Sequence, residues 1–245
     1  MQGWIIYRQN ITELSPEAYE INRLVEIAQT EGINLKVFKP EQFDLIVTAE
    51  DRRSILIDGE PTALPDFVLP RMGAGTTYFA LAVIRHLERL GVHCFNSSNS
   101  IETVKDKLFS QQILAENGLP VPKTMLAKFP LNIEMVRKNI GFPVVVKTLS
   151  GSQGKGVFLS RTEKEFNDLT QLIEVTNPNA NFILQQFVES SFGRDIRIFT
   201  IGGRAIAAME RRSANSDFKA NFSSGGTVKQ IEITPEIEWM AAEAT

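Results

Sequence analysis

The sequence is poor in the residues that build disulfides and metal centres. Its 245 residues include one cysteine, Cys94, and two histidines, His86 and His93. A single cysteine cannot close an internal disulfide, which favours a reducing compartment. The apolar neighbours of Cys94 predict a buried strand residue. Two histidines are too few for a His-rich metal site, and we interpret both as structural.

Long apolar runs and a strong net charge are also absent. No stretch approaches the roughly 18 apolar residues of a membrane helix, and MQGWIIYRQN lacks the apolar segment of a signal peptide. The net charge of −3 and the pI near 5.6 argue against a general nucleic-acid or membrane partner. We therefore expect a soluble, cytoplasmic protein.

The charge is distributed unevenly along the chain. Residues 1–98 hold 9 Lys+Arg and 13 Asp+Glu, whereas residues 99–245 hold 17 and 16. The second part of the chain is therefore the better place for an anionic ligand.

The first hundred residues alternate between expected strands and helices. The segment 15–32 is typical of a helix with Ser15 as its cap, Pro16 at its first position and Gly32 past its end. A second helix is expected over 76–91, and Asp58-Gly59 indicates a hairpin turn. This rhythm predicts an N-terminal α/β sheet domain over residues 1–98, and the polar segment 96–100 reads as a connector.

The sequence after residue 100 predicts one long helix, then a pair of strands, a second helix and a strand-rich region. The helix is expected over 101–118, and apolar strands flank the glycine-rich segment 147–160. Thr162 and Glu165 form a capping box that begins another helix. From residue 182 onward the pattern is strand-rich, with a long polar loop over 213–226. We place two further subdomains at 99–181 and 182–245.

The stretch KTLSGSQGKGVFLS, residues 147–160, breaks two good strands with glycine and serine and places lysines beside the break. Backbone amides of such a loop can converge on an anion. A Walker loop does not fit, because only two residues separate Gly151 from Gly154, and a dinucleotide fingerprint does not fit, because the loop leads into a strand. An ordinary glycine-rich hairpin remains open.

A loop that folds down as a lid over a nucleotide's phosphates fits the pattern better. Lys147 closes the strand before the loop, and a lysine in an apolar strand is costly unless it pairs with an anion. Strand alternation can turn its ammonium group away from the core. Lys107, on the preceding helix, is by itself more typical of a solvated charge.

Four segments in order carry a resemblance to a known family. They are DKLFSQQIL, then PVVVKTLSGSQGKGVFL, then ILQQFVESSFGRDIRIFTIGGRAIAAMERR, then DFKANFSSGG. The chain resembles the ATP-grasp superfamily and, within it, the RimK-type α-L-glutamate ligases. The resemblance implies an α/β ATP-grasp fold behind an N-terminal α/β domain. It also implies an ATP-dependent carboxylate–amine ligase that acts through an acyl phosphate.

The resemblance also implies roles for matched residues. Lys107 and Lys147 match the phosphate-side lysines, positions 186 and 187 match the adenine hinge, and Asp195 matches the ribose side. Family members commonly carry a glutamate where this chain has Gln186. The implied catalytic residues are Arg197, Arg211 and Asn221, and the implied ATP-binding residues are Lys107, Lys147, Gly151, Ser152, Gln153, Gly154, Lys155, Gly156, Gln186, Phe187, Asp195 and Lys219.

Arginines suit this chemistry because phosphoryl transfer crowds negative charge around the transferred group. Arg211 and Arg212 are adjacent on one expected strand, so they point to opposite faces. We expect Arg211 to face the site and Arg212 to be solvated or to face substrate. Without the resemblance, a surface ion pair would be the simpler interpretation of Arg197 and Arg211.

The match departs from the family at the metal site. Family members hold Mg²⁺ with an aspartate and a Glu-x-Asn pair that follow a helix corresponding to PEIEWMAAEAT, where this sequence stops. We therefore expect the C-terminal part to be incomplete, no metal ligands in this chain, and no ligation by the chain as given. The implied partners are ATP, a carboxylate donor such as glutamate, and an amine acceptor that is a small molecule, peptide or protein terminus.

Two other interpretations remain open. One is a nucleotide-binding module without catalysis, and the other is an ATP-grasp ligase for other amino-acid or peptide substrates. Whether the protein forms a homo-oligomer is also open.

Overall fold

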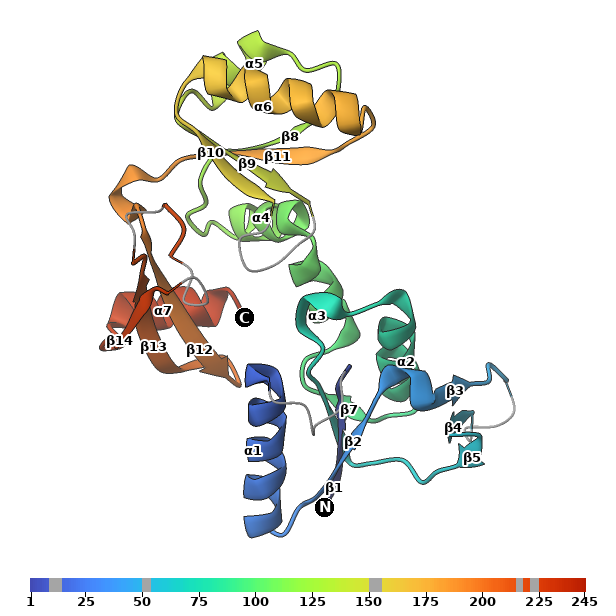
Figure 1. The fold of residues 1–245 in the computed structure, drawn as a ribbon. Coiled ribbons are helices and arrows are strands. Elements are labelled where there is room, and N and C mark those ends of the chain that lie inside the picture. The colour runs from blue at the N-terminus through green and yellow to red at the C-terminus, as the bar shows by residue number, and fades with distance from the viewer. Residues whose placement is uncertain (9–14, 50–53, 150–155, 215–217, 221–224) are drawn as a thin grey trace. The chain divides into compact units, whose positions relative to one another are not determined.

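The computed structural model describes residues 1–8, 15–49, 54–149, 156–214, 218–220 and 225–245 (Figure 1). The chain divides into two compact units, Met1–Lys105 and Asp106–Thr245. The subdomain limits expected from the sequence, after residues 98 and 181, stay predictions. Within the described ranges, no helix combines the length and apolar character that a membrane crossing requires.

The first unit is built on a parallel sheet. Its strand order is β2 (Asn34–Phe38), β1 (Gln2–Ile6), β6 (Phe67–Pro70) and β7 (His93–Cys94). Helix α1 (Pro16–Thr30) and helix α2 (Tyr78–Arg89) cover its two faces. Each helix contributes apolar residues to a separate cluster of buried side chains with the sheet. The expected α/β sheet domain is therefore confirmed.

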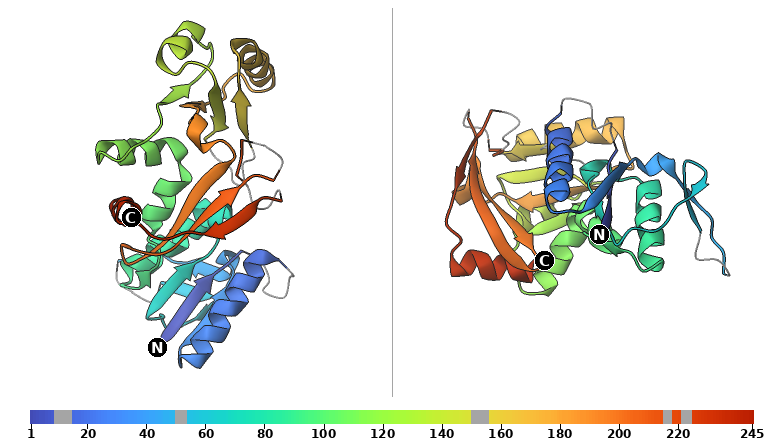
Figure 2. Two further views of the ribbon diagram at one scale, coloured as in Figure 1. Left: turned by 90° about the vertical axis from the view of Figure 1, so that its left-hand side faces the viewer. Right: turned by 90° about the horizontal axis from the view of Figure 1, so that it is seen from below.

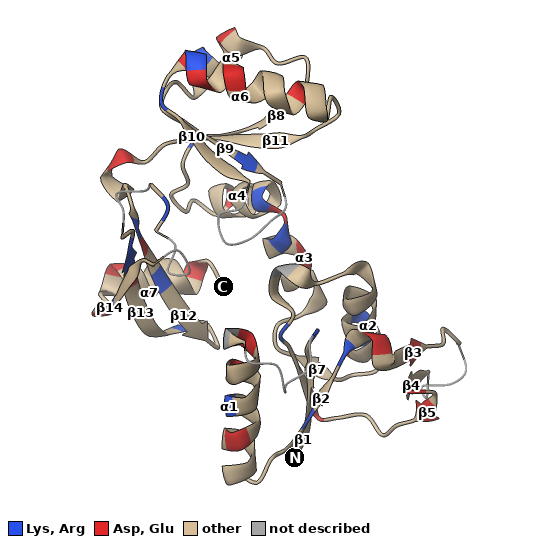
Figure 3. Ribbon diagram, in the orientation of Figure 1, with Lys and Arg blue, Asp and Glu red and all other residues tan. Residues whose placement is uncertain are grey.

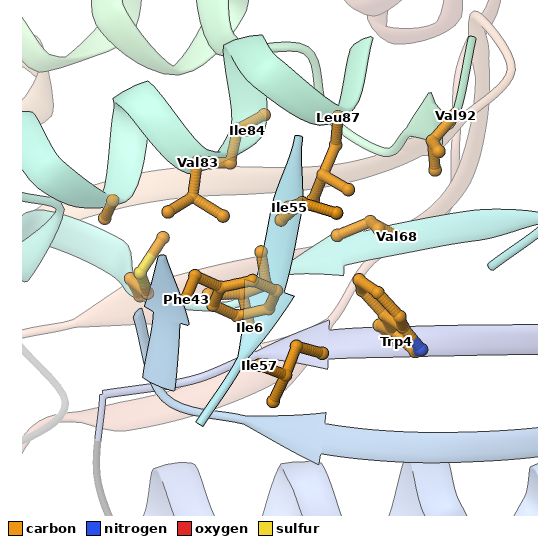
Figure 4. Close-up of a cluster of buried hydrophobic side chains, with 12 residues drawn as sticks. Trp4, Ile6, Phe43, Ile55, Ile57, Val68, Val83, Ile84, Leu87 and Val92 are labelled. Atoms are coloured by element: carbon orange, nitrogen blue, oxygen red, sulfur yellow. The ribbon is translucent and has the colours of Figure 1, made fainter. Parts of the chain in front are cut away.

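Side-chain alternation along β1 explains why both faces are buried. Ile5 and Tyr7 pack with α1, whereas Trp4 and Ile6 pack with α2 (Figure 4). A small second sheet of β3 (Phe43–Leu45), β4 (Ile55–Ile57) and β5 (Glu60–Pro61) adds apolar residues to the α2 side. Its turn is the expected Asp58-Gly59 pair, with φ of 52° and 79°.

Cys94 lies at the end of β7 and is only partly buried. The desolvation that accompanies this burial, together with the charge of Glu88, raises the pKa of the thiol to about 12. Such a thiol is protonated at neutral pH and is a weak nucleophile.

The helix expected over 101–118 is two helices, and the expectation of one was wrong. They are α3 (Ser98–Lys105) and α4 (Lys107–Glu116). The Asp106 carboxylate accepts hydrogen bonds from Leu108 N at 2.9 Å and Phe109 N at 3.0 Å. This capping fixes Asp106 in an extended conformation, which interrupts the helix. The residues 98–100, expected in a connector, belong to α3.

The second unit contains an antiparallel sheet in the order β10 (Val157–Ser160), β9 (Val144–Thr148), β11 (Phe182–Gln186) and β8 (Thr124–Ala127). Helices α5 (Ile133–Asn139) and α6 (Glu163–Thr176) bury one face through a shared core of Val144, Val146, Leu184 and Phe166. By alternation, Lys147 and its register partners Val157 and Ile183 lie on the other face of this sheet. Lys107 of α4 donates hydrogen bonds to the backbone carbonyl oxygens of Thr148 and Leu149, at the end of β9.

The second unit contains another antiparallel sheet. It consists of β12 (Arg194–Ile201), β13 (Arg204–Arg212) and β14 (Thr227–Gln230), with α7 (Pro235–Glu243) packed against β12 and β13 (Figure 2). Thr234 caps α7 and Pro235 is its first residue, as the sequence predicts. In the described part of the chain, three short 3₁₀ turns, η1 (Pro40–Gln42), η2 (Gly73–Gly75) and η3 (Glu189–Ser191), lie in the connections.

Candidate functional site

Lys147 lies on the sheet β10-β9-β11-β8, hereafter the central sheet. It places an ammonium group on the face of this sheet opposite the core formed with α5 and α6. It lies near the end of β9, and its Nζ donates a hydrogen bond to Gln185 Oε1 of β11. Burial lowers the pKa of Lys147, and the nearby charge of Lys107 lowers it further. Within the part of the chain that the structure describes, no carboxylate lies within ion-pair distance of Lys147.

Lys107 approaches the same end of β9 from helix α4. Its Nζ lies 3.2 Å from the carbonyl oxygens of both Thr148 and Leu149 and donates to them. Desolvation lowers the pKa of Lys107, and the Asp106 carboxylate partly offsets this. Figure 3 shows the basic residues of β9 and of the start of α4 in blue. Two ammonium groups with lowered pKa values, gathered at one strand end, fit a polyanionic group such as a nucleotide's phosphates.

The glycine loop begins where these ammonium groups gather. Ser150 and the predicted site residues Gly151, Ser152, Gln153, Gly154 and Lys155 lie outside the described residues. Gly156 is described and has a φ of +71°. A Cβ there would lie 2.5 Å from Thr148 Oγ1, and Gly156 O accepts from Thr148 N at 3.0 Å. Only glycine fits this close approach of β10 to β9.

Gln186 and Phe187 stand at the end of β11, where the family match expects an adenine hinge. Gln186 N donates to Lys123 O at 2.8 Å, and Gln186 Oε1 accepts from Lys123 N at 3.4 Å. The Gln186 side chain is exposed, and the Phe187 ring packs edge-on against Phe192 at 6.1 Å between centroids. An adenine contact at this strand end stays a prediction.

Asp195 and Arg211 form a bidentate ion pair across β12 and β13. Arg211 Nε lies 2.7 Å from Asp195 Oδ1, and Nη2 lies 2.5 Å from Oδ2. Hydrogen bonding to Asp195 raises the pKa of the Arg211 guanidinium group. The Arg211 side chain is 16% exposed and that of Arg212 is 63% exposed, so the two neighbours differ in exposure as strand alternation predicts. That Arg211 faces the nucleotide site stays a prediction. The sequence left an ion pair open as the simpler interpretation of Arg211, but it did not indicate Asp195 as the partner.

The remaining predicted site residues are less closely grouped. Arg197 is exposed and lies on the same strand face as Asp195 by alternation. The Lys219 ammonium group lies 5.9 Å from the centroid of the Phe158 ring and 5.4 Å from that of Phe218. Asn221 lies outside the described residues. The structure therefore brings together Lys107 with Lys147, and Asp195 with Arg211.

Gln185 is a residue that sequence reasoning missed. It is buried and binds the Lys147 ammonium group directly. Its one signal was a polar side chain inside the apolar strand ILQQFV, where burial requires hydrogen-bond partners.

The described residues contain no group of three or more His, Cys, Asp or Glu side chains that could hold a metal ion. The expected loss of the Mg²⁺ ligands with the C-terminal part stays a prediction.

Comparison with known protein families shows which family the chain belongs to. Residues 104–245 match the RimK-like ATP-grasp domain, and residues 10–101 match the RimK pre-ATP-grasp domain. The chain belongs to the RimK-like ATP-grasp family. Members of this family are ATP-dependent ligases that use ATP, generally with Mg²⁺, and act through an acyl phosphate. The resemblance seen in the sequence is thereby confirmed.

Named relatives agree with this assignment. The chain is 35% identical over 235 residues to a probable alpha-L-glutamate ligase of Marinomonas sp. strain MWYL1, a match that covers 96% of this chain and 77% of the relative. It is 37% identical over 222 residues to one of Maridesulfovibrio salexigens, covering 90% and 72%.

Solved structures share the fold at low identity. The ATP-grasp ligase PsnB, complexed with precursor peptide PsnA2 and AMPPNP, superposes with a TM-score of 0.69 at 18% identity, covering 99% of this chain and 78% of that one. The D-alanine–D-alanine ligase of Bacillus anthracis superposes with a TM-score of 0.64 at 17% identity, covering 99% and 75%. The ATP-grasp fold expected from the sequence is confirmed.

Proposed function

We propose that this protein ligates a carboxylate to an amine at the expense of ATP, with glutamate as the carboxylate donor. The observation that supports it most directly is the pair of ammonium groups, Lys107 and Lys147, at the strand end before the glycine loop. The relatives named alpha-L-glutamate ligases support the choice of donor.

In the proposed first step, a carboxylate oxygen attacks the γ-phosphorus of ATP. The bond from the γ-phosphorus to the β–γ bridging oxygen breaks, ADP leaves, and an acyl phosphate forms. In the second step, an amine attacks the carbonyl carbon, a C–N bond forms, the C–O bond to phosphate breaks, and the amine proton passes to solvent or phosphate. The products are ADP, phosphate and an amide.

The side chains have distinct roles in this proposal. Lys107 and Lys147 hold the phosphate chain and offset its charge, and Gly156 lets the loop close tightly over it. Gln186 and Phe187 receive the adenine, and Asp195 receives the ribose. Arg197, Arg211, Lys219 and Asn221 stabilise charge near the γ-phosphate and the acyl group.

Asp195 holds the Arg211 side chain in place, because the bidentate ion pair fixes the plane of the guanidinium group. The described residues contain no group of three or more His, Cys, Asp or Glu side chains that could hold a metal ion, and each role above belongs to a residue of this chain.

The amine acceptor is the least defined partner, and a small molecule, a peptide and a protein terminus all fit the proposal. PsnB, a structural neighbour, is complexed with a peptide, which makes peptides the first acceptors to try. A cytoplasmic location and the oligomeric state stay predictions.

The proposal is tested by product analysis with a panel of carboxylates and amines. We expect ADP and phosphate to form in a glutamate-dependent reaction, with a new amide seen by mass spectrometry. AMP and pyrophosphate as products would contradict the acyl-phosphate route. Turnover with another amino acid but not glutamate would favour a ligase for other substrates, and nucleotide binding without any turnover would favour a binding module.

Nucleotide binding is tested separately with Lys147→Ala. A hydrogen bond to a charged group is worth about 1.5–3 kcal/mol, so the Kd for AMPPNP measured by calorimetry should weaken by roughly 10- to 150-fold. Lys164→Ala, which removes an exposed lysine of α6, serves as the control. Unchanged affinity in Lys147→Ala would remove this lysine from the site.

A further inference from the structure

Gln185 makes hydrogen bonds at both ends of its amide while its side chain is buried. Gln185 is 8% exposed. It lies on the same face of the central sheet as Lys147, at the diagonal position on the neighbouring strand. Its Oε1 accepts from Lys147 Nζ. Its Nε2 donates to Thr124 Oγ1 at 2.9 Å and toward Gln111 Oε1 at 3.4 Å.

The partners of Gln185 fix which way its amide points. Thr124 Oγ1 donates its single hydrogen to Pro122 O at 2.9 Å, so it can only accept from Gln185. Gln111 presents its carbonyl oxygen, which also only accepts. Thr124 therefore requires the NH₂ group of Gln185, and Lys147, whose ammonium group can only donate, requires the oxygen.

We propose that Gln185 is a positioning residue, which holds the Lys147 ammonium group toward a bound phosphate chain through a neutral oxygen. This inference rests on the proposed function, because it assumes that Lys147 meets the nucleotide. An amide oxygen occupies one of the three N–H donors and leaves the full positive charge for the ligand. A carboxylate in its place would form an ion pair and compete with the phosphates.

The described residues around Lys147 also leave its positive charge without a compensating negative charge. Strands β8, β10 and β11 contain no acidic or basic residue. Helix α4 contributes Lys107, whose positive charge repels that of Lys147 and lowers its pKa. Asp106 acts on Lys107. Within the described chain the charge of Lys147 is therefore left for a ligand to compensate.

The decisive variant is Gln185→Glu, which keeps the shape and adds one negative charge. We expect the Kd for AMPPNP at pH 7 to weaken about tenfold. The pH at which affinity falls should move upward, because the new carboxylate raises the pKa of Lys147. Gln185→Met should also weaken binding, but its fall should not move to higher pH. Wild-type affinity and an unmoved pH profile in Gln185→Glu would overturn the proposal.

The orientation argument has its own test, which does not alter Gln185. Thr124→Val removes the hydroxyl that selects the NH₂ end, so affinity should fall several-fold, whereas Thr124→Ser should restore it. Equal affinity in the two variants would overturn the orienting role. Gln171→Glu, at an exposed position of α6, is the control for an added charge.

Lys147→Ala separates the two levels of failure. If it binds AMPPNP as tightly as the wild type, the phosphate contact of the proposed function is wrong. If it binds weakly while Gln185→Glu binds normally, the positioning role alone is overturned.

Discussion

At the scale of single residues, Lys147 is placed at a cost to the fold. Its pKa is lowered by burial and by Lys107, so the unfolded chain holds its proton more tightly than the folded chain does. The penalty is present below the lowered pKa and is relieved as pH rises toward the unfolded value near 10.5.

We therefore expect Lys147→Met to be more stable than the wild type at pH 7, with the difference shrinking by pH 10. Urea unfolding at the two pH values measures it, and Lys164→Met is the exposed control. A variant that is less stable at pH 7 would show that the lost hydrogen bond to the buried Gln185 Oε1 outweighs the cost of the buried charge.

Gly156 offers a second prediction at residue scale. Gly118 has almost the same φ, +72° against +71°, but a Cβ there would meet nothing within 4 Å, whereas at Gly156 it would strike Thr148. Gly118→Ala should cost about 1 kcal/mol of unfolding free energy, the ordinary penalty for a left-handed residue. Gly156→Ala should cost at least about 1 kcal/mol more. Equal losses in denaturant unfolding would show that Thr148 moves aside freely.

The residues with a strong chemical signature were predictable from the sequence. Lys147 stood out as a charge in an apolar strand, and alternation separated Arg211 from Arg212. Gln185 did not stand out, because a buried amide can be satisfied in many ways and the strand pattern does not show which partner it meets.

At the scale of elements, register explains why the Asp195–Arg211 pair could not be foreseen. The turn at Gly202-Gly203 pairs Ile201 with Arg204, and regular pairing from there would oppose Asp195 to Glu210. An irregularity between Phe199 and Thr200 shifts the register by one residue and brings Arg211 opposite Asp195. Bulges of this kind leave no reliable mark in one sequence.

The break between α3 and α4 was missed for a related reason. Helical periodicity continues across it, but the side chain of Asp106 competes for the backbone N–H groups that a continuous helix would use.

Asp106→Ala should therefore cost about 1 kcal/mol of unfolding free energy, since it leaves two N–H groups of α4 without a cap. Because Lys107 is the first residue of α4, nucleotide affinity should fall as well. Asp106→Asn keeps a capping oxygen and serves as the matched variant. If both lose the same stability, the charge of Asp106 matters more than the cap.

At the scale of the whole molecule, the alternating pattern of the first unit and the family match of the second were readable from the sequence. The candidate nucleotide residues all fall in one unit, Asp106–Thr245. Nucleotide binding should therefore stabilise the second unit and leave the first unit unchanged.

Hydrogen exchange with and without AMPPNP measures that difference. A ligand that binds only the folded state stabilises it by about 2.7 kcal/mol at a hundred times Kd, and backbone amides that exchange by opening the binding unit slow accordingly. We expect added protection in β9, β11 and α4, where Lys147, Gln185 and Lys107 lie. Strands β1 and β6 should exchange as before, because no candidate residue lies in the first unit. The Lys147→Ala variant should lose most of the added protection at the same nucleotide concentration, since it weakens binding without altering the core beneath α5 and α6. Protection that appears first in β1 and β6 would place the nucleotide on the N-terminal unit and contradict the assigned site.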